Sequence, residues 1–318
     1  MSAFPVLRAA DLEDRPKERL WLVHDLWADE AVGILGGEPK CFKSFLALDV
    51  AVSVASGAPC LRHFEPARVG PVLLFAAEDA AHVVRQRLVG IALAADTCLD
   101  ALDIHVITAP VVRLDLAEDR AKLRRTVETI QPVLLVLDPF VRLHRVDENT
   151  ASEVAPILAW LRELQRELHM AVLLVHHSRK GAAHARAGQA LRGSSELHAW
   201  GDSNLYLRRK NDRLLLSVEH RAAPSASDLA VELHRNGDAL ALRVTPSDDA
   251  APAPSELPAS TLERVERALI DASGPLSLHD LRRACAMRTA SVCDTLAILT
   301  SHGRVERSTQ GYRLVNPA

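Results

Sequence analysis

Short apolar runs alternate with longer stretches of mixed character between the N-terminus and Gly201. Each run is mostly apolar at successive positions rather than at every second position, which is typical of strands buried on both faces of a sheet. The predicted strands are residues 31–35, 71–76, 104–107, 133–137 and 171–175. The predicted helices between them are residues 43–56, 81–94, 117–129 and 153–167. This alternation predicts an α/β fold with a mostly parallel sheet and right-handed crossovers.

The pattern changes after Gly201. Shorter β-type runs follow one another and are separated by tight turns such as Asn236-Gly237-Asp238, a spacing that favours hairpins over crossover helices. These predicted strands are residues 203–208, 213–220, 230–234 and 239–244. We therefore expect antiparallel strands that extend the parallel sheet at one edge.

Residues 246–259 differ in composition from the segments on either side. Four prolines and few large apolar residues make this segment typical of an extended, semi-rigid linker. It separates a large domain, residues 21–245, from a small domain, residues 260–318. Residues 1–20 form an N-terminal arm ahead of the large domain.

The small domain is predicted to contain three helices and a terminal hairpin. Helical patterns cover residues 261–272, 279–285 and 290–301, and β-type runs cover residues 304–308 and 311–315. This order resembles a winged helix-turn-helix, a module that binds duplex DNA or docks a partner protein. The wing would carry Arg304, Arg307 and Arg313.

Bulk composition restricts the compartment and the partners. Of the 318 residues, 48% are hydrophobic and 25% are charged, and the net charge of -3 means that any nucleic-acid surface must be local. Five cysteines without a Cys-x-x-Cys pair argue against a disulfide framework or a zinc site and favour a reducing compartment. No apolar run reaches the roughly 18 residues that a membrane span needs, and the N-terminus lacks the apolar core of a signal peptide. We expect a cytoplasmic protein without membrane contact.

The run from Gly36 to Ser44 follows a predicted strand and opens a predicted helix, which is the context of a phosphate-binding P-loop. Backbone N–H groups and the helix N-terminus attract phosphates in such a loop. Lys43 would reach the β- and γ-phosphates of ATP, and the Ser44 hydroxyl would bind Mg²⁺. The predicted nucleotide-binding residues are Gly37, Glu38, Pro39, Lys40, Cys41, Phe42, Lys43, Ser44 and Phe45.

Phe42 stands where a P-loop usually has glycine. Glycine tolerates unusual backbone angles and a close approach of the ligand, so we expect Phe42 to fit there only with a negative φ. On this motif alone, a strand–turn–helix with an unrelated Lys-Ser pair remains an alternative.

Two further predicted strands end in carboxylates. Asp138 closes the apolar run 133–137, at the strand end where ligands bind in open α/β sheets, and would hold Mg²⁺ through water. Glu78 follows the run 71–76 and would orient and deprotonate the attacking water. The alternatives are that Asp138 caps a turn or helix, that Asp79 is the base, or that Glu78 and Asp79 only begin the next helix, where the dipole favours acids.

His176 and His177 follow the predicted strand at 171–175. Neighbouring residues on a strand point to opposite faces, so the pair is unsuited to a single metal ion. We predict that His177, rather than His176, senses the γ-phosphate through a hydrogen bond.

The RecA-like P-loop ATPases show motifs similar to these in the same order, and the chain looks most like their RepA-like hexameric helicases. The resemblance covers residues 21–244 and rests on the P-loop together with Ala77-Glu78-Asp79, Leu135-Val136-Leu137-Asp138, His176-His177-Ser178-Arg179-Lys180-Gly181 and Leu191-Arg192-Gly193-Ser194-Ser195. It implies a RecA-like core, a catalytic base at Glu78, and coupling of the γ-phosphate to DNA-binding loops through His177.

The resemblance also implies a homo-oligomer, a ring such as a hexamer, with ATP between subunits. An arginine from the neighbouring subunit would then stabilise the charge of the transition state. Arg221 in the last hairpin is our preferred candidate, ahead of Arg208, Arg209 and Lys210. The alternative is that Arg221 is a surface arginine without this role.

Two basic segments follow predicted strand ends and are candidates for contacts with single-stranded DNA. One carries Arg142 and Arg145 beside Phe140, which could stack a base. The other has no acidic residue and carries Arg179, Lys180, Arg186 and Arg192. Alternatively, both segments are solvated loops that close over the nucleotide.

The sequence thus predicts ATP hydrolysis that is coupled to the binding or translocation of nucleic acid, first of all single-stranded DNA. One alternative is a DNA-anchored regulatory switch with little motor activity, which Phe42 and the small domain favour. Another is a P-loop kinase of a small molecule, against which the paired histidines and the late antiparallel strands argue.

Overall fold

The chain divides into two compact units, Met1–Pro246 and Ser247–Ala318, which are described separately. The computed structural model describes residues 4, 6–11, 16, 19–177, 195–210, 213–245, 259–272, 274–285, 292, 295, 296, 298–300, 304–308 and 311–315. The predicted linker at 246–259 therefore lies outside the described residues except for Ala259.

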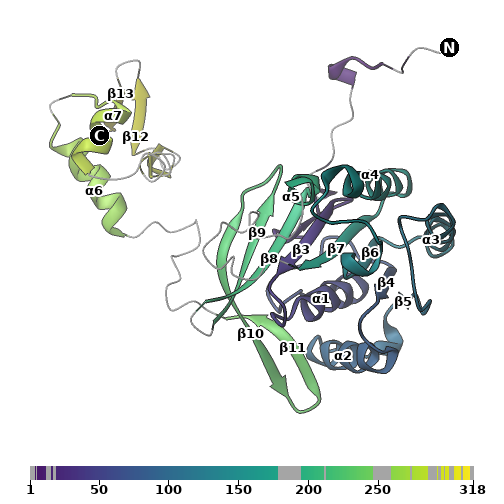
Figure 1. Ribbon diagram of the computed structural model, residues 1–318. Coiled ribbons are helices and arrows are strands. Elements are labelled where there is room, and N and C mark those ends of the chain that lie inside the picture. The colour runs from purple at the N-terminus through teal and green to yellow at the C-terminus, as the bar shows by residue number, and fades with distance from the viewer. Residues whose placement is uncertain are drawn as a thin grey trace. The chain divides into compact units, whose positions relative to one another are not determined.

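The large unit is built on one sheet, in which nine strands are described in the order β11-β10-β9-β8-β3-β7-β6-β4-β5 (Figure 1). Parallel pairing runs from β8 through β3, β7, β6 and β4 to β5. The strands are β3 Val32–Gly37, β4 Val72–Ala76, β5 Ile104–Val106, β6 Leu134–Asp138, β7 Ala171–His177, β8 Ser203–Lys210, β9 Arg213–His220, β10 Ala226–Asn236 and β11 Ala239–Val244. A separate two-stranded sheet joins β1 Trp21–Val23 to β2 Trp27–Ala28.

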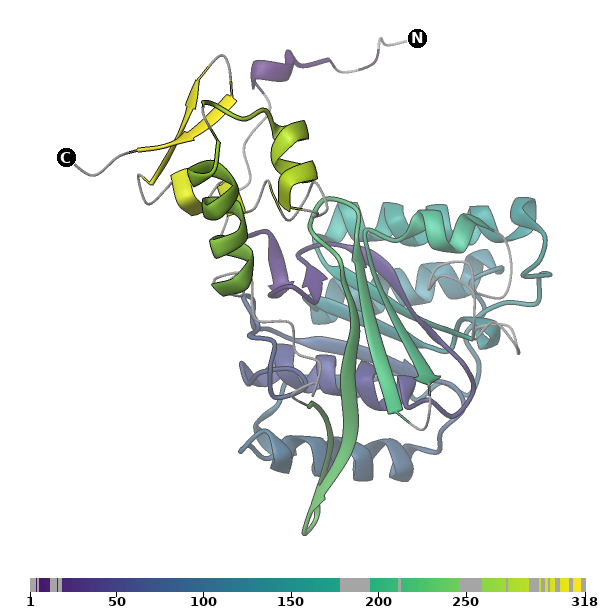
Figure 2. The same cartoon turned by 90° about the vertical axis from the view of Figure 1, so that its left-hand side faces the viewer.

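Helices cover both faces of the parallel part of the sheet (Figures 1 and 2). Helices α1 (Lys43–Ser56) and α2 (Ala81–Ala94) pack in one hydrophobic cluster, whereas α3 (Ala117–Ile130) and α4 (Ala151–Leu168) pack in the other. Successive residues of one strand enter opposite clusters: Leu134 and Val136 face α1, and Leu135 and Leu137 face α4. Burial on both faces explains why these strands are apolar at successive positions.

The antiparallel extension is formed by β8 to β11. The hairpin of β10 and β11 reaches α2, where Gly90 lies so close to Leu240 that a Cβ on Gly90 would be 3.3 Å from the Leu240 nitrogen. The predicted α/β fold with antiparallel edge strands is confirmed. Shorter described elements are the helix α5 (Ser195–Trp200) and the 3₁₀ turns η1 (Ala9–Asp11), η3 (Leu99–Ala101) and η4 (Phe140–Arg142).

The small unit has its own hydrophobic cluster, with Val265, Leu281 and Val305 almost completely buried. Two helices, α6 (Ala259–Ile270) and α7 (Leu278–Cys285), and the hairpin of β12 (Val305–Ser308) and β13 (Gly311–Leu314) are described. The predicted third helix at 290–301 lies partly outside the described residues, so the winged helix-turn-helix remains a prediction. Among the helices that the structure describes, none combines the length and apolar character needed to cross a bilayer.

Candidate nucleotide and hydrolysis site

The candidate site lies at the carboxyl ends of four neighbouring strands, β3, β7, β6 and β4. The register places Gly37 of β3 beside His177 of β7, and Ala76 of β4 beside Asp138 of β6. The Ala77 nitrogen continues this pairing by donating to the Asp138 carbonyl at 2.8 Å. Parallel strands therefore bring motifs that are distant in the sequence to one edge of the sheet.

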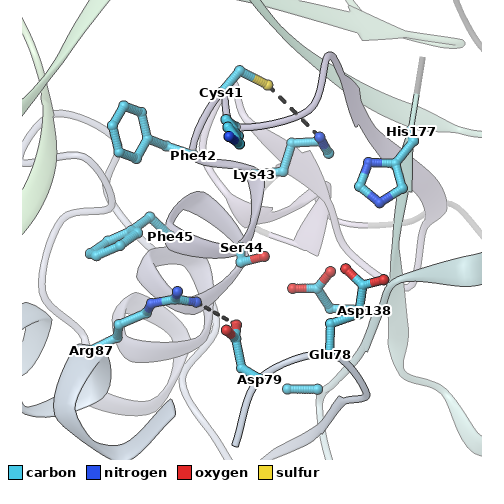
Figure 3. Close-up of a pocket in the computed structure, with 12 residues that line it drawn as sticks. Cys41, Phe42, Lys43, Ser44, Phe45, Glu78, Asp79, Arg87, Asp138 and His177 are labelled. Carbon is cyan, nitrogen blue, oxygen red and sulfur yellow. Dashed lines mark hydrogen bonds and ion pairs between the residues drawn. The ribbon is translucent and has the colours of Figure 1, made fainter. Parts of the chain in front are cut away.

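These strand ends surround a pocket of about 440 Å³, which is large enough for a small organic ligand. Figure 3 shows that its side chains come from the P-loop, from α1 and α2, and from the ends of β4, β6 and β7. The lining residues are Lys40, Cys41, Phe42, Lys43, Ser44, Phe45, Ala76, Glu78, Asp79, Arg87, Asp138 and His177. Most of the predicted nucleotide-binding and metal-binding residues thus face one cavity.

The backbone of Phe42 is left-handed, with φ 65° and ψ 24°. Our expectation of a negative φ at this position was therefore wrong. Phe42 occupies the N-cap position of α1, where the chain turns from the loop into the helix, and no side-chain hydrogen bond caps this helix end. The ring is held by Phe45, with centroids 6.1 Å apart, and by the Arg209 guanidinium, 5.6 Å from the ring centroid. Packing thus maintains a conformation that a bulky residue seldom adopts.

The uncapped N-terminus of α1 is suited to bind phosphate, since its first-turn N–H groups need acceptors. Lys43 begins this helix, and its side chain is almost completely buried. Its Nζ donates to the Glu38 carbonyl at 2.7 Å and lies 3.9 Å from the Cys41 sulfur. Burial lowers the pKa of Lys43, although Cys41 and Asp138 oppose this shift. Among the described residues no carboxylate forms an ion pair with this buried ammonium, and a triphosphate would supply an anionic partner.

Ser44 and Asp138 provide adjacent oxygen donors inside the pocket (Figure 3). Asp138 is 9% exposed, and burial raises its pKa to about 6, against an opposing hydrogen bond with Ser44. A hydroxyl and a carboxylate are the hard ligands that Mg²⁺ prefers, with water completing the coordination. A cation would also relieve the cost of burying the Asp138 charge, so the residues fit Mg²⁺.

Glu78 and Asp79 both follow β4, but they have different partners. The Glu78 carboxylate is 44% exposed, and its Oε1 accepts a hydrogen bond from the Arg142 Nε at 3.0 Å. Asp79 forms an ion pair with Arg87 of α2, and the Arg87 guanidinium lies 5.2 Å from the centroid of the Phe45 ring. Of the two acids, Asp79 is thus held by α2, whereas the partner that the described residues offer Glu78 is an exposed arginine.

The two histidines at the end of β7 lie in different environments. His177 lines the pocket, and its Nδ1 is buried without a hydrogen-bond partner among the described residues. Burial, with a further contribution from Lys43, lowers the pKa of His177. His176 is 1% exposed, and its Nδ1 lies 3.9 Å from Glu148, which also contacts His144 at 3.5 Å. Only His177 is therefore in a position to contact a nucleotide.

Arg221 and Arg145 both pair with acids that do not line the pocket. Arg221 forms an ion pair with Asp202 at 3.3 Å and does not line the pocket. Arg145 contacts Asp115 at 3.6 Å and is 64% exposed. Our expectation that Phe140 could stack a base was wrong, because Phe140, the first residue of η4, is completely buried. The predicted nucleic-acid residues Arg179, Lys180, Arg186 and Arg192 lie outside the described residues.

Arg87 and Arg209 contribute to the surroundings of the P-loop without having been predicted from the sequence. Arg87 lines the pocket through its contacts with Asp79 and Phe45, and Arg209 was considered only as an arginine for a neighbouring subunit, although it packs on Phe42. Neither residue belongs to a local motif, because each reaches the P-loop from an element that is distant in the sequence. No pattern in the sequence could have identified them.

Two comparisons with known proteins agree with this architecture. A family model described as an AAA domain matches residues 2–183. A solved structure of a DnaB-like replicative helicase, described with its interactions with primase, has a similar fold, with a TM-score of 0.51 and 15% sequence identity. The match covers 67% of this chain and 59% of that chain. At this identity the likeness concerns the fold.

Proposed function

We propose that the chain, which belongs to the AAA domain family, is an ATPase that couples ATP hydrolysis to the binding of single-stranded DNA. The observation that supports the proposal best is the single pocket shared by Lys43, Ser44, Asp138, Glu78 and His177. A nucleotide and a hydrolytic apparatus can both be accommodated there. The fold resembles that of a DnaB-like replicative helicase.

In this proposal the triphosphate binds at the N-terminus of α1. The first-turn N–H groups and the Lys43 ammonium contact its oxygens, and Ser44 and Asp138 hold the magnesium ion of the substrate. When bound, Mg²⁺ supplies positive charge beside the β- and γ-phosphates. The Lys43 ammonium would exchange its hydrogen bond to the neutral Glu38 carbonyl for an ion pair with anionic phosphate oxygens.

Glu78 is the proposed general base. Water attacks the γ-phosphorus while its proton passes to Glu78, and the bond to the bridging oxygen breaks with its electron pair leaving on ADP. His177 ends β7, which lies beside β3 and its P-loop, and would contact the γ-phosphate through its ring. The basic segment that carries Arg179 and Arg192 follows His177 directly in the sequence. In this proposal, loss of the contact between His177 and the γ-phosphate changes how that segment binds DNA.

The nucleic-acid surface is proposed to include Arg142 and Arg145. Both follow the end of β6 and are exposed by 61% and 64%, so phosphates can reach them. Arg179, Lys180, Arg186 and Arg192 would add to this surface from the sequence pattern alone. A ring-shaped homo-oligomer, with Arg221 acting in a neighbouring subunit, and duplex DNA or protein binding by the small unit are further parts of the proposal.

A DNA-anchored regulatory switch is the second candidate function. It is favoured by the left-handed Phe42 in the P-loop and by the ion pair that holds Glu78, since both features fit slow turnover. The two candidates share the nucleotide site and differ in how strongly hydrolysis responds to single-stranded DNA.

Steady-state ATP hydrolysis with and without an oligothymidylate tests the proposal. We expect stimulation by the oligonucleotide in the wild-type chain and little hydrolysis in Lys43→Ala and Glu78→Gln in either condition. Hydrolysis that is indifferent to the oligonucleotide would contradict coupling while leaving the ATPase intact. ATP binding with very slow hydrolysis in both conditions would favour the switch.

A further inference from the structure

The candidate base and a candidate DNA-binding residue contact each other directly: the Arg142 Nε lies 3.0 Å from the Glu78 Oε1. We propose that Arg142 is a positioning residue that holds Glu78 away from the attacking water until a nucleic-acid phosphate binds Arg142. This inference rests on the proposed function, because it assigns to Glu78 the role of the base. It assigns the coupling between DNA binding and hydrolysis to one contact, between the Arg142 Nε and the Glu78 Oε1.

The backbone of Arg142 is firmly anchored. Arg142 ends η4, its nitrogen donates to the Pro139 carbonyl at 3.1 Å, and its carbonyl accepts from the Arg113 Nη1 at 2.9 Å. The flanking side chains of Phe140 and Leu143 are completely buried. The guanidinium therefore projects from a fixed point, and movement of its side chain is enough to make or break the contact with Glu78.

Both partners are accessible to ligands from solvent. The Arg142 side chain is 61% exposed and the Glu78 side chain is 44% exposed. An exposed ion pair of this kind is weak, so an incoming anion can displace one partner from the other. A buried pair would resist such exchange because breaking it leaves an uncompensated charge.

The chemistry of the guanidinium makes phosphate the natural competitor. Arginine presents a planar set of N–H donors that matches carboxylate and phosphate oxygens equally well. While Oε1 of Glu78 accepts a hydrogen bond from Arg142, it is less available to accept a proton from water. When a backbone phosphate of single-stranded DNA binds the Arg142 guanidinium, the Glu78 carboxylate is therefore released to accept a proton from water.

A matched control pair lies outside the pocket. Arg243 Nε donates to Glu232 Oε1 at 2.7 Å, and the two side chains are 44% and 45% exposed. This is also an exposed arginine–glutamate pair, but neither residue lines the nucleotide pocket. Removal of Arg243 changes the charge of the chain as removal of Arg142 does, without touching Glu78.

The test measures kcat and KM for ATP in the full chain, with and without an oligothymidylate, for the wild type, Arg142→Gln, Arg142→Lys and Arg243→Gln. We expect Arg142→Gln to raise the DNA-free kcat by about threefold to fivefold, as suits a weak ion pair, with an unchanged KM and no further stimulation. Arg142→Lys should restore the low DNA-free rate, and Arg243→Gln should behave like the wild type. The double variant Arg142→Gln/Glu78→Gln should lose the gain, because the gain acts through Glu78.

The outcomes separate this inference from the proposed function. If DNA stimulates the wild type while Arg142→Gln has a wild-type or lower DNA-free kcat, coupling stands and the role of Arg142 is overturned. If DNA fails to stimulate the wild type but Arg142→Gln still raises kcat, the positioning of Glu78 stands and DNA is the wrong ligand. Thermal unfolding of each variant shows whether an altered rate reflects an altered fold.

Discussion

The Arg209 guanidinium lies over the Phe42 ring, 5.6 Å from its centroid, while the backbone of Phe42 is left-handed with φ 65°. A side chain from β8 thus holds a P-loop residue in a conformation that costs a non-glycine residue roughly 1–3 kcal/mol. The contact comes from outside the motif. The shape of the P-loop therefore depends on the antiparallel edge of the sheet as well as on its own sequence.

Replacement of Phe42 separates the backbone requirement from the ring. Glycine adopts a left-handed conformation without strain, so Phe42→Gly should keep ATP affinity within about threefold of the wild type. Valine is β-branched and disfavours a positive φ, so Phe42→Val should weaken binding by roughly tenfold or more, equivalent to about 1.4 kcal/mol. Isothermal titration with MgATP gives both values. Equal affinities for the two variants would contradict the left-handed loop.

The buried carboxyl of Asp138 predicts a dependence of stability on pH. Burial raises its pKa from 3.8 to about 6, so its contribution to stability is fully present below pH 3.8 and is lost as the pH rises through about 6. The shift corresponds to about 3 kcal/mol. In EDTA, Asp138→Asn should therefore unfold several degrees above the wild type at pH 7.5, by about half that margin at pH 5, and close to it at about pH 4.

MgATP should reverse the order of the unfolding temperatures of Asp138→Asn and the wild type at pH 7.5. In the proposed site the ionised Asp138 carboxylate holds the magnesium of MgATP, so MgATP should stabilise the wild type more at pH 7.5 than at pH 5 and should stabilise Asp138→Asn little at either pH. Thermal unfolding with and without MgATP provides the measurement. If ligand-free Asp138→Asn unfolds at a lower temperature than the wild type at pH 7.5, burial of the ionised Asp138 carboxylate does not destabilise the fold.

A buried carboxylate in α1 predicts a large effect on stability away from the pocket. Asp49 is completely buried, and its Oδ1 accepts hydrogen bonds from the Leu61 nitrogen at 2.8 Å and from the Arg62 Nη2 at 2.9 Å. Arg62→Ala should lower the free energy of unfolding by roughly 2–3 kcal/mol, because it leaves the Asp49 charge without its partner. Urea denaturation provides the value.

Arg124→Ala is the control for that measurement. Arg124 pairs with Glu167 on the surface, and the two side chains are 31% and 45% exposed. An exposed pair contributes at most about 1 kcal/mol, so the urea midpoint should change little. Similar midpoints for the Arg62 and Arg124 variants would mean that the Asp49 carboxylate does not depend on its ion pair.

Helix limits in the large unit could be predicted closely from the sequence, because they depend on local signals. Helix α1 ends where Gly57 adopts φ 80° and its nitrogen donates to the Ser53 carbonyl, and glycine after an apolar stretch predicts such an end. The end of β7 was less predictable. It continues to His177 because pairing with Gly37 extends it beyond the apolar residues, and polarity alone does not reveal that pairing.

In the site, too, residues marked by local sequence could be predicted, whereas contacts between residues distant in the sequence could not. The P-loop, Asp138 and Glu78 could be found because each follows an apolar strand directly, and parallel strands place such residues at one sheet edge. The partners of these residues could not be found. Arg142 reaches Glu78 across a separation of 64 positions, and the left-handed Phe42 depends on Arg209, so only tertiary packing reveals either contact.

Glu78 lies in the pocket with Lys43 and Asp138, and we propose it as the base for ATP hydrolysis. Single-turnover hydrolysis of bound ATP by Glu78→Gln and by Asp79→Asn tests it most directly, because the two acids are neighbours and only Asp79 is held by Arg87. We predict that Glu78→Gln binds ATP but hydrolyses it about 100-fold to 10,000-fold more slowly, as expected for loss of a general base, while Asp79→Asn stays within about threefold of the wild type. A slow Asp79→Asn beside a nearly normal Glu78→Gln would contradict the claim and assign the base to Asp79.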